Sequence, residues 1–336
     1  CTSFAWGEPV TKGKWLSFEH TQSEPNSWYI YRKDVNLKDH PKSITARIAV
    51  DTKYWLWIND ELVVFEGGLK RGPERNATYY DEVEIAPYLR TGDNTIAVLV
   101  WHFGRNGFSH VNSGMAGLWF EAVAPGVEIV SDGSWQGMIY GAYQDTDAPF
   151  PNYRLPESNI RFDARKELIG WNTKAFTGNI HGSFIMNDPA DVPVGKLVKR
   201  PIPLWKDYGL TDYVNVRKSI GGDSLFCRLP YNCHITPYLK VRASAGTMIK
   251  MQTDNYLGGS TPNVRAEYVT REGEQSYESL GWMNGHEVWY IIPEGVEVLE
   301  VKYRETGYNA EFVEPFRCND GFYNELWKRS ARTLYV

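Results

Sequence analysis

Strict alternation of apolar and polar residues is the feature that most limits the fold of this chain. In residues 43–50 (SITARIAV), Ile44, Ala46, Ile48 and Val50 fall on one face, and a period of two is typical of a strand with one buried face. Further β-rich runs cover residues 54–58, 62–65, 95–101 and 117–123, joined by turn-prone links. Short strands at this spacing, without strong helical periodicity, predict a β-sandwich or jelly roll.

A second β-rich block follows a connector that contains proline. Residues 188–205 carry Pro189, Pro193, Pro201 and Pro203 without any periodicity, which is typical of a semi-rigid connector. Beyond it, β-rich runs lie at residues 236–243, 247–252, 264–270, 287–292 and 298–304. We therefore predict a mainly β chain with two antiparallel, jelly-roll-like β-sandwich domains, at residues 1–200 and 201–314.

The last segment, residues 315–336, changes to helical spacing. Asn319 and Asp320 offer an N-cap, and apolar residues then recur at helical intervals as Phe322, Leu326, Trp327, Ala331 and Leu334. Since no Gly or Pro stop signal precedes Val336, we expect the sequence to end inside the first helix of a further domain.

Composition argues against several classes of protein. The net charge of −5 disfavours a broad nucleic-acid-binding surface, and no apolar stretch approaches the ~18 residues of a membrane span. Aromatic residues are plentiful, at 14% of the chain, and they either fill cores or hold a ligand.

The four cysteines are too few and too scattered for a disulfide framework. Cys227 and Cys233 flank Arg-Leu-Pro-Tyr-Asn, and either pair across a turn or stay free as small buried hydrophobes. Cys1 fits two interpretations: a bacterial lipoprotein after signal removal, or an arbitrary boundary. The first predicts a periplasmic or cell-surface protein that is lipid-anchored through Cys1.

Four groups of residues occur in an informative order. They are residues 54–60 (YWLWIND) with 89–98 (LRTGDNTIAV), residues 100–104 (VWHFG), residues 162–165 (FDAR) with Gly170 and Trp171, and residues 281–285 (GWMNG) through 302–308 (KYRETGY) to 322–327 (FYNELW). Together they resemble the N-terminal part of bacterial α-L-rhamnosidases of the inverting, (α/α)-barrel type.

The resemblance implies a secreted glycoside hydrolase that releases terminal α-L-rhamnose from plant polysaccharides or glycosides. In that family the acid and base carboxylates lie on the helical barrel, which begins where this chain ends. The resemblance therefore implies no catalytic residue in this span, no cofactor, and two partners: a rhamnose-containing glycan and the chain's own C-terminal helical domain. The alternative is a stand-alone carbohydrate-binding sandwich protein.

One segment, residues 101–112, is dense in rings and hydrogen-bonding groups. A sugar site needs an aromatic platform beside a few placed polar groups. Trp101, Phe103 or Phe108 are candidates for stacking, and the candidates for binding hydroxyls or a uronate carboxylate are His102, Arg105, His110 and Asn112. The competing interpretation makes Trp101 and Phe103 core residues and the loop an interdomain packing element.

Other motifs favour structural roles. The seven histidines show no metal-ligand spacing, and a solvated turn is favoured over a calcium site for Asp145 and Asp147. No nucleophile motif is present. Three rings are expected to fill the second sandwich or its interface, namely Trp282, Trp289 and Tyr290. Arg304 and Glu305 are candidates for an interdomain ion pair, with an exposed pair of little energetic value as the default.

Overall fold

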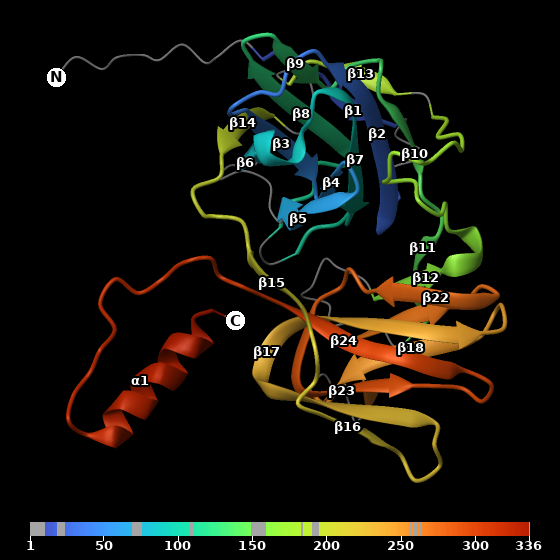
Figure 1. The fold of residues 1–336 in the computed structure, drawn as a ribbon, viewed down its shortest axis with the longest axis vertical. Coiled ribbons are helices and arrows are strands. Elements are labelled where there is room, and N and C mark those ends of the chain that lie inside the picture. The colour runs from blue at the N-terminus through green and yellow to red at the C-terminus, as the bar shows by residue number, and fades with distance from the viewer. Residues whose placement is uncertain are drawn as a thin grey trace.

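The computed structural model describes residues 11–18, 24–68, 76–107, 110–148, 159–182, 184–189, 195–255, 257–258, 261–262 and 264–335. Strands make up 53% and helices 7%, which confirms the predicted mainly β class. Two sandwich units lie one above the other, with a C-terminal helix to one side (Figure 1). No helix in the described part combines the length and apolar character that a membrane crossing requires.

Among the described residues, the first unit packs a seven-stranded sheet against a five-stranded one. Its core includes the fully buried Tyr29, Tyr31 and Tyr54. The seven-stranded sheet has the order β13 (Ile185–Asn187), β1 (Trp15–Ser17), β8 (Gly117–Ala124), β3 (Thr45–Asp51), β6 (Ala77–Glu84), β14 (Lys196–Lys199), with β9 (Val127–Val130) on β8. The five-stranded sheet has the order β10 (Gln136–Ile139), β2 (Ser27–Leu37), β7 (Gly92–His102), β4 (Lys53–Ile58), β5 (Glu61–Gly68).

A hairpin with a two-residue turn joins β4 and β5. Asn59 and Asp60 have φ values of 50° and 75°, and two central residues with positive φ are typical of the tight turns that match strand twist. Glu61 already belongs to β5.

The second unit is built around one long strand, β17 (Ser224–Ala243). β23 pairs with residues 224–228 of β17 and, after a register shift, with residues 233–235. β16 pairs with the first part of β17, and β22 and β24 pair with its last part. Within the described residues the sheet has ten strands; the others are β11 (Tyr143–Asp145), β12 (Ile160–Asp163), β15 (Lys206–Thr211), β16 (Asn215–Lys218), β18 (Met248–Thr253), β21 (Arg265–Val269), β22 (Gly273–Glu278), β23 (Met283–Ile291) and β24 (Glu297–Gly307). A small hairpin pairs β19 (Leu257–Gly258) with β20 (Thr261–Pro262).

Strand pairing links the two sequence blocks. β11 and β12 come from the first block, yet β12 pairs in parallel with β21 of the second, because the edge of β21 needs a hydrogen-bonding partner. β14, in the proline-containing connector, pairs in parallel with β6. The division at residue 200 stays a prediction, and the two blocks share the ten-stranded sheet.

β7 is buried on both faces. Val98 and Val100 belong to the core of the first sandwich, whereas Leu99 and Trp101 belong to a second hydrophobic cluster. This cluster, here called the shared core, continues from the five-stranded sheet into the second unit. It includes Trp28, Trp55, Leu99, Trp101 and Phe103 from the first unit and Leu225, Ile235, Met251, Tyr268 and Tyr290 from the second. Burial on both faces explains the nearly continuous apolar run of residues 95–101.

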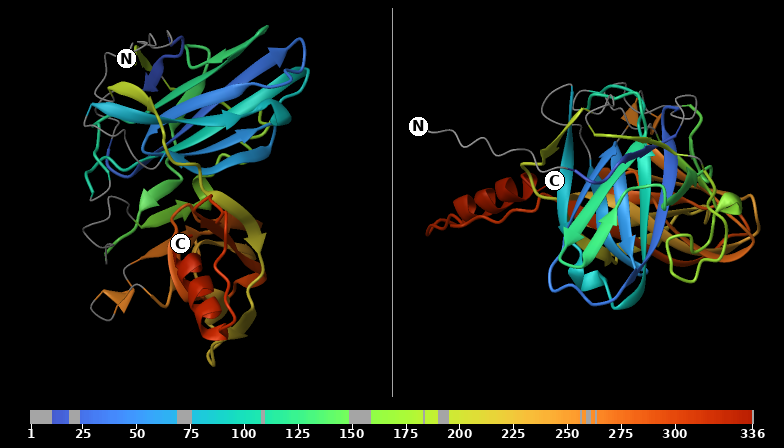
Figure 2. Two further views of the ribbon diagram at one scale, coloured as in Figure 1. Left: turned by 90° about the vertical axis from the view of Figure 1, so that its left-hand side faces the viewer. Right: turned by 90° about the horizontal axis from the view of Figure 1, so that it is seen from above.

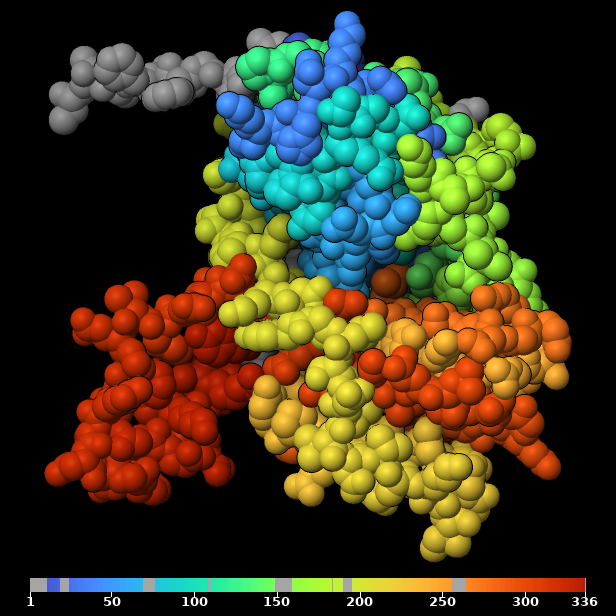
Figure 3. Space-filling model, in the orientation of Figure 1, coloured from blue at the N-terminus to red at the C-terminus, as the bar shows by residue number. Residues whose placement is uncertain are grey.

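The predicted C-terminal helix is confirmed as α1 (Gly321–Thr333). The Asp320 side chain caps it by accepting a hydrogen bond of 2.8 Å from the Phe322 N–H. α1 lies to one side of the second sandwich (Figure 1, Figure 2), and Phe322 and Leu326 are exposed. In Figure 3, the chain around β15, in yellow, lies across the junction of the two units.

Candidate functional site

Trp101, the central ring of the predicted sugar loop, lies in the shared core. Its ring stacks on Trp28 at a centroid distance of 5.4 Å and meets the edge of Phe103 at 4.9 Å. Trp101 and Phe103 are each 1% exposed, and Phe108 lies outside the described residues. This burial supports the packing interpretation, because a stacking platform must be open to its ligand.

A buried ion pair lies beside these rings. Lys53 stands opposite Trp101 in the β4–β7 register, and its Nζ is 2.8 Å from Glu66 Oε1. The same nitrogen lies 5.6 Å and 5.5 Å from the centroids of Trp101 and Phe103. Ring faces attract cations, and a charge this deeply buried needs a partner. Sequence reasoning missed both charged residues, since Lys and Glu ordinarily predict solvent exposure.

The two histidines of the loop surround a buried carboxylate. His102 Nδ1 is 3.1 Å from the main-chain oxygen of Asp51, and it lies 3.5 Å from the Asp51 carboxylate. His110 Nε2 is 3.7 Å from that carboxylate, and the Ser113 N–H donates to it at 3.0 Å. Burial raises the pKa of Asp51, but the hydrogen bonds and positive charge of the histidines outweigh it and hold the pKa well below its usual range.

This arrangement contains groups suited to acid–base chemistry, yet it is closed to substrate. Asp51 and His102 are fully buried and His110 is 2% exposed. A general base must reach the proton that it abstracts. These non-covalent contacts therefore hold residues 102–113 against the junction of β3 and β4.

The remaining two predicted residues lie nearer the surface. Arg105 is exposed and Asn112 is half-buried. The Asn112 N–H donates to Asn106 Oδ1 at 2.8 Å, and its side-chain oxygen accepts from Gly114 at 2.9 Å. The structure therefore does not bring the five predicted residues together on one open surface.

The second unit contributes an aromatic cluster around His234. This ring lies 5.4 Å from Trp205 and 4.5 Å from Trp282, and its Nδ1 is 2.7 Å from Thr306 Oγ1. Burial, together with the positive charge of Lys53, lowers the pKa of His234 to about 3. Lys53 therefore acts electrostatically across the junction between the two units.

The sequence prediction for the three aromatic residues of the second block is confirmed in two cases. Tyr290 is fully buried in the shared core, and the half-buried Trp282 packs with a tilted ring against His234. It is wrong for Trp289, which is half-buried on the opposite face of β23, because successive side chains of a strand point to opposite faces.

The proposed ion pair between Arg304 and Glu305 is wrong for the same reason. Arg304 donates to Glu278 at 2.6 Å and covers the ring of Phe65 at 4.8 Å, so it does reach the first unit. Glu305 points the other way and pairs with Arg332 of α1.

The possible disulfide between Cys227 and Cys233 is not formed, and Asp147 belongs to an ion pair. Cys227 and Cys233 are free and buried, and burial raises the pKa of both thiols to about 12. Cys1 lies outside the described residues. Asp147 pairs with Arg161 at 2.8 Å, and no group of three metal-ligating side chains occurs in the part of the chain that the structure describes.

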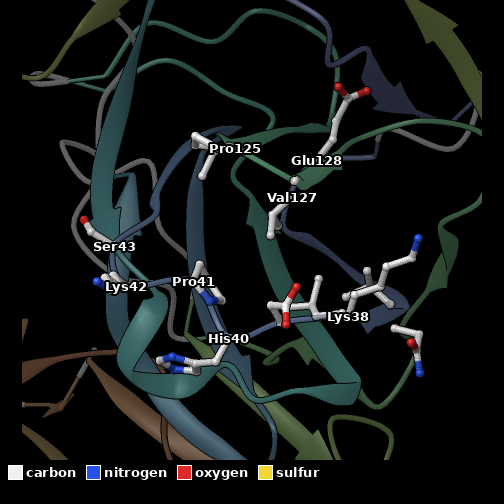
Figure 4. Close-up of a pocket in the computed structure, with 14 residues that line it drawn as sticks. Lys38, His40, Pro41, Lys42, Ser43, Pro125, Val127 and Glu128 are labelled. Atoms are coloured by element: carbon white, nitrogen blue, oxygen red, sulfur yellow. The ribbon is translucent and has the colours of Figure 1, made fainter.

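An open groove of about 800 Å³ lies at the other end of the first sandwich. The chain after β2 and the turn between β8 and β9 form its walls, with Pro41 and Val127 inside and Lys42 and Glu128 at its margins (Figure 4). Among the described residues that line it, the only ring is the His40 imidazole. These residues therefore offer no aromatic stacking platform for a sugar.

No family model and no curated protein matches this chain. Solved structures do share its fold. The GH78 family rhamnosidase of Bacillus sp. GL1 matches with a TM-score of 0.78 and 16% identity, over 96% of this chain and 58% of that one. The α-L-rhamnosidase of Dictyoglomus thermophilum matches with a TM-score of 0.67 and 18% identity, over 95% and 38%. That of Aspergillus terreus matches with a TM-score of 0.66 and 18% identity, over 94% and 38%. The chain thus spans less than two thirds of each.

Proposed function

We propose that this chain forms the non-catalytic, N-terminal β-domains of an α-L-rhamnosidase that removes terminal α-L-rhamnose from plant polysaccharides or glycosides. The main support is that 96% of this chain matches a rhamnosidase structure with a TM-score of 0.78, and that the match covers 58% of the rhamnosidase chain. An inverting glycosidase needs two carboxyl groups about 6.5–9.5 Å apart around a water molecule. The proposal assigns them to a helical domain beyond residue 336, with which these β-domains would pack.

The buried cluster supports a structural role for the β-domains. Trp101 lies in the shared core, and the buried Lys53–Glu66 pair lies beside it, so these residues serve packing. Arg105 and Asn112 are the accessible members of the predicted sugar loop, and the proposal gives them the contact with the glycan.

We propose that the protein acts in the periplasm or at the surface of a bacterium, because the proposed substrates, plant polysaccharides and glycosides, lie outside the cell. The lipid on Cys1 stays a prediction. Mass spectrometry of the N-terminal peptide from native membranes tests it. A diacylglyceryl adduct on Cys1 is expected, and an unmodified thiol would contradict the anchor.

Hydrolysis of nitrophenyl α-L-rhamnoside tests the proposed function. We expect no turnover by residues 1–336 and turnover by the longer native chain that the proposal requires. Turnover by residues 1–336 alone would show that the catalytic groups lie inside the span. A native chain that ends at residue 336 and binds rhamnosides as a stable monomer would favour the stand-alone carbohydrate-binding protein.

The surface of the loop has its own test. Replacing Arg105 with Ala should weaken the binding of a rhamnose-containing oligosaccharide several-fold, because a guanidinium donates paired hydrogen bonds to hydroxyl or carboxylate oxygens. Lys166→Ala, on an exposed lysine of the same chain, is the matched control. Unchanged affinity in Arg105→Ala would leave the whole loop with a packing role.

A further inference from the structure

The outer face of the second sandwich carries an aromatic pair that packing does not explain. Cross-strand register places Arg217 of β16, Phe226 of β17, Trp289 of β23 and Gln252 of β18 in one row. Their sequence neighbours Leu225, Cys227, Val288 and Tyr290 point inward and are buried. The row therefore lies on the side of the sheet away from the sandwich interior.

The rings in this row are held in place and remain accessible. Phe226 and Trp289 are half-buried and meet edge to face at 5.8 Å. The Arg217 guanidinium lies 4.5 Å from the Phe226 centroid and donates two hydrogen bonds of 3.1 Å to Glu287. Glu287 also accepts from the Trp289 indole N–H at 3.3 Å. A platform with its side chains fixed in advance loses less entropy on binding.

Two cations on this face take part in no ion pair among the described residues. Glu287 is already engaged by Arg217, and Glu267 by Arg161 and Arg265. Arg228 lies opposite Glu287, and Lys250 lies opposite Ile291 of β23 and Glu267 of β21. Both cations are exposed, and neither has a carboxylate within ion-pair distance among the described residues.

The opposite outer face of the same sandwich differs. Its exposed cations are matched, since Lys240 pairs with Glu274 at 2.7 Å and Arg242 with Glu297 at 2.6 Å. The combination of rings and unmatched cations is therefore specific to the face of β16, β17, β23 and β18.

We propose that this face binds an acidic saccharide, with Trp289 and Phe226 against the apolar face of a sugar ring and Arg228 and Lys250 on uronate carboxylates. Aromatic faces suit the C–H surface of a pyranose, and the two cations supply charge complementarity toward an anion. Gln252 and Arg217 border the rings and offer hydrogen bonds to hydroxyls. All the residues in this proposal belong to the second sandwich, and the proposal does not depend on the proposed rhamnosidase function.

Isothermal titration calorimetry of the whole chain with a short oligogalacturonate tests the proposal, with a neutral galactan oligosaccharide of equal length as the reference. We expect binding of the acidic oligosaccharide that weakens with added salt. Trp289→Ala should weaken it at least about tenfold, and Arg228→Gln several-fold with a shallower salt dependence. Trp289→Phe keeps a ring and should retain most of the affinity, which separates ring loss from misfolding.

Arg242→Gln, on the opposite face, is the matched control and should bind like the unaltered protein. The proposal is overturned if oligogalacturonate does not bind, or if Trp289→Ala and Arg228→Gln bind it unchanged. Weakening by Lys38→Gln or Lys42→Gln alone would assign the ligand to the groove of the first sandwich and would also overturn it. Nitrophenyl α-L-rhamnoside contains no uronate, so its hydrolysis tests the proposed enzyme independently of this binding site.

Discussion

Two aromatic clusters of this molecule use the same kinds of side chain in opposite surroundings. In the shared core, Trp101 and Phe103 lie beside the Lys53–Glu66 ion pair, and all four are buried. On the outer face of the second sandwich, Trp289 and Phe226 lie beside the Arg217–Glu287 pair, and the rings are half-buried. What covers the sheet, and not which residues it carries, decides whether such a cluster packs or stays available for a ligand.

The difference also sets the energy of each ion pair. An exposed pair contributes about 0–1 kcal/mol, because water screens it. A buried pair has lost its water, so removing one partner costs about 3–5 kcal/mol. Substitutions in the buried cluster should therefore reduce the free energy of unfolding more than substitutions in the outer cluster. Four predictions follow from the effect of burial.

The largest effect is expected for Trp101→Ala. Removing a fully buried tryptophan leaves a cavity between Trp28 and Phe103, and such truncations cost about 3–5 kcal/mol in the free energy of unfolding. Urea unfolding measures it. A variant of unchanged stability that has lost sugar binding would instead restore Trp101 as a binding platform.

Lys53→Met comes next, at about 3 kcal/mol, because it leaves the Glu66 carboxylate buried without its cation. The double variant Lys53→Met/Glu66→Leu removes both charges and should recover much of this loss. Lys240→Met, at an exposed pair with Glu274, is the matched control and should cost less than about 1 kcal/mol. Equal losses in Lys53→Met and its control would contradict the assigned role of burial.

The third prediction concerns pH. The pKa of His234 is about 3 in the folded protein and 6.5 as the ordinary value, so the unfolded state binds more protons between these values. His234 does not lower the free energy of unfolding above about pH 6.5. It lowers this free energy as the pH falls toward 3, by about 1–2 kcal/mol between pH 6.5 and 5. His234→Gln should reduce this slope, while His286→Gln, at an exposed site, should leave it unchanged. An identical slope in all three proteins would contradict the assignment to His234.

The sequence predicted the strands that have one buried face and the capped helix, because their periodicity is local. The periodicity did not identify β2, where Trp28 to Tyr31 are buried on both faces. It also did not identify the first part of β17, where a register shift breaks the pattern. The alternation argument that found β3 also separates Trp289 from Tyr290, since adjacent residues of a strand cannot fill the same core.

The candidate site was less predictable than the fold. The density of rings in residues 101–112 is a real signal, but the buried cluster that contains Trp101 also draws on residues such as Leu225 and Tyr290, which lie more than a hundred positions further along the chain. Lys53 and Glu66 carry no local sign of burial, because only the tertiary contact makes their environment apolar. Sequence therefore identifies groups with sugar-binding chemistry, and the packing of the two units determines which of them are accessible.

The smallest effect on stability is expected for Trp289→Ala, and this variant tests the comparison most directly. The ring is half-buried, and its neighbours on the outer face are Phe226, Gln252 and Glu287, so its loss should cost less than about 1 kcal/mol in the free energy of unfolding. The same substitution should weaken oligogalacturonate binding at least about tenfold. Trp101→Ala should show the reverse pattern, with a large loss of stability. If Trp289→Ala were as destabilising as Trp101→Ala, its cluster would serve packing as well, and the difference in burial would not mark a difference in function.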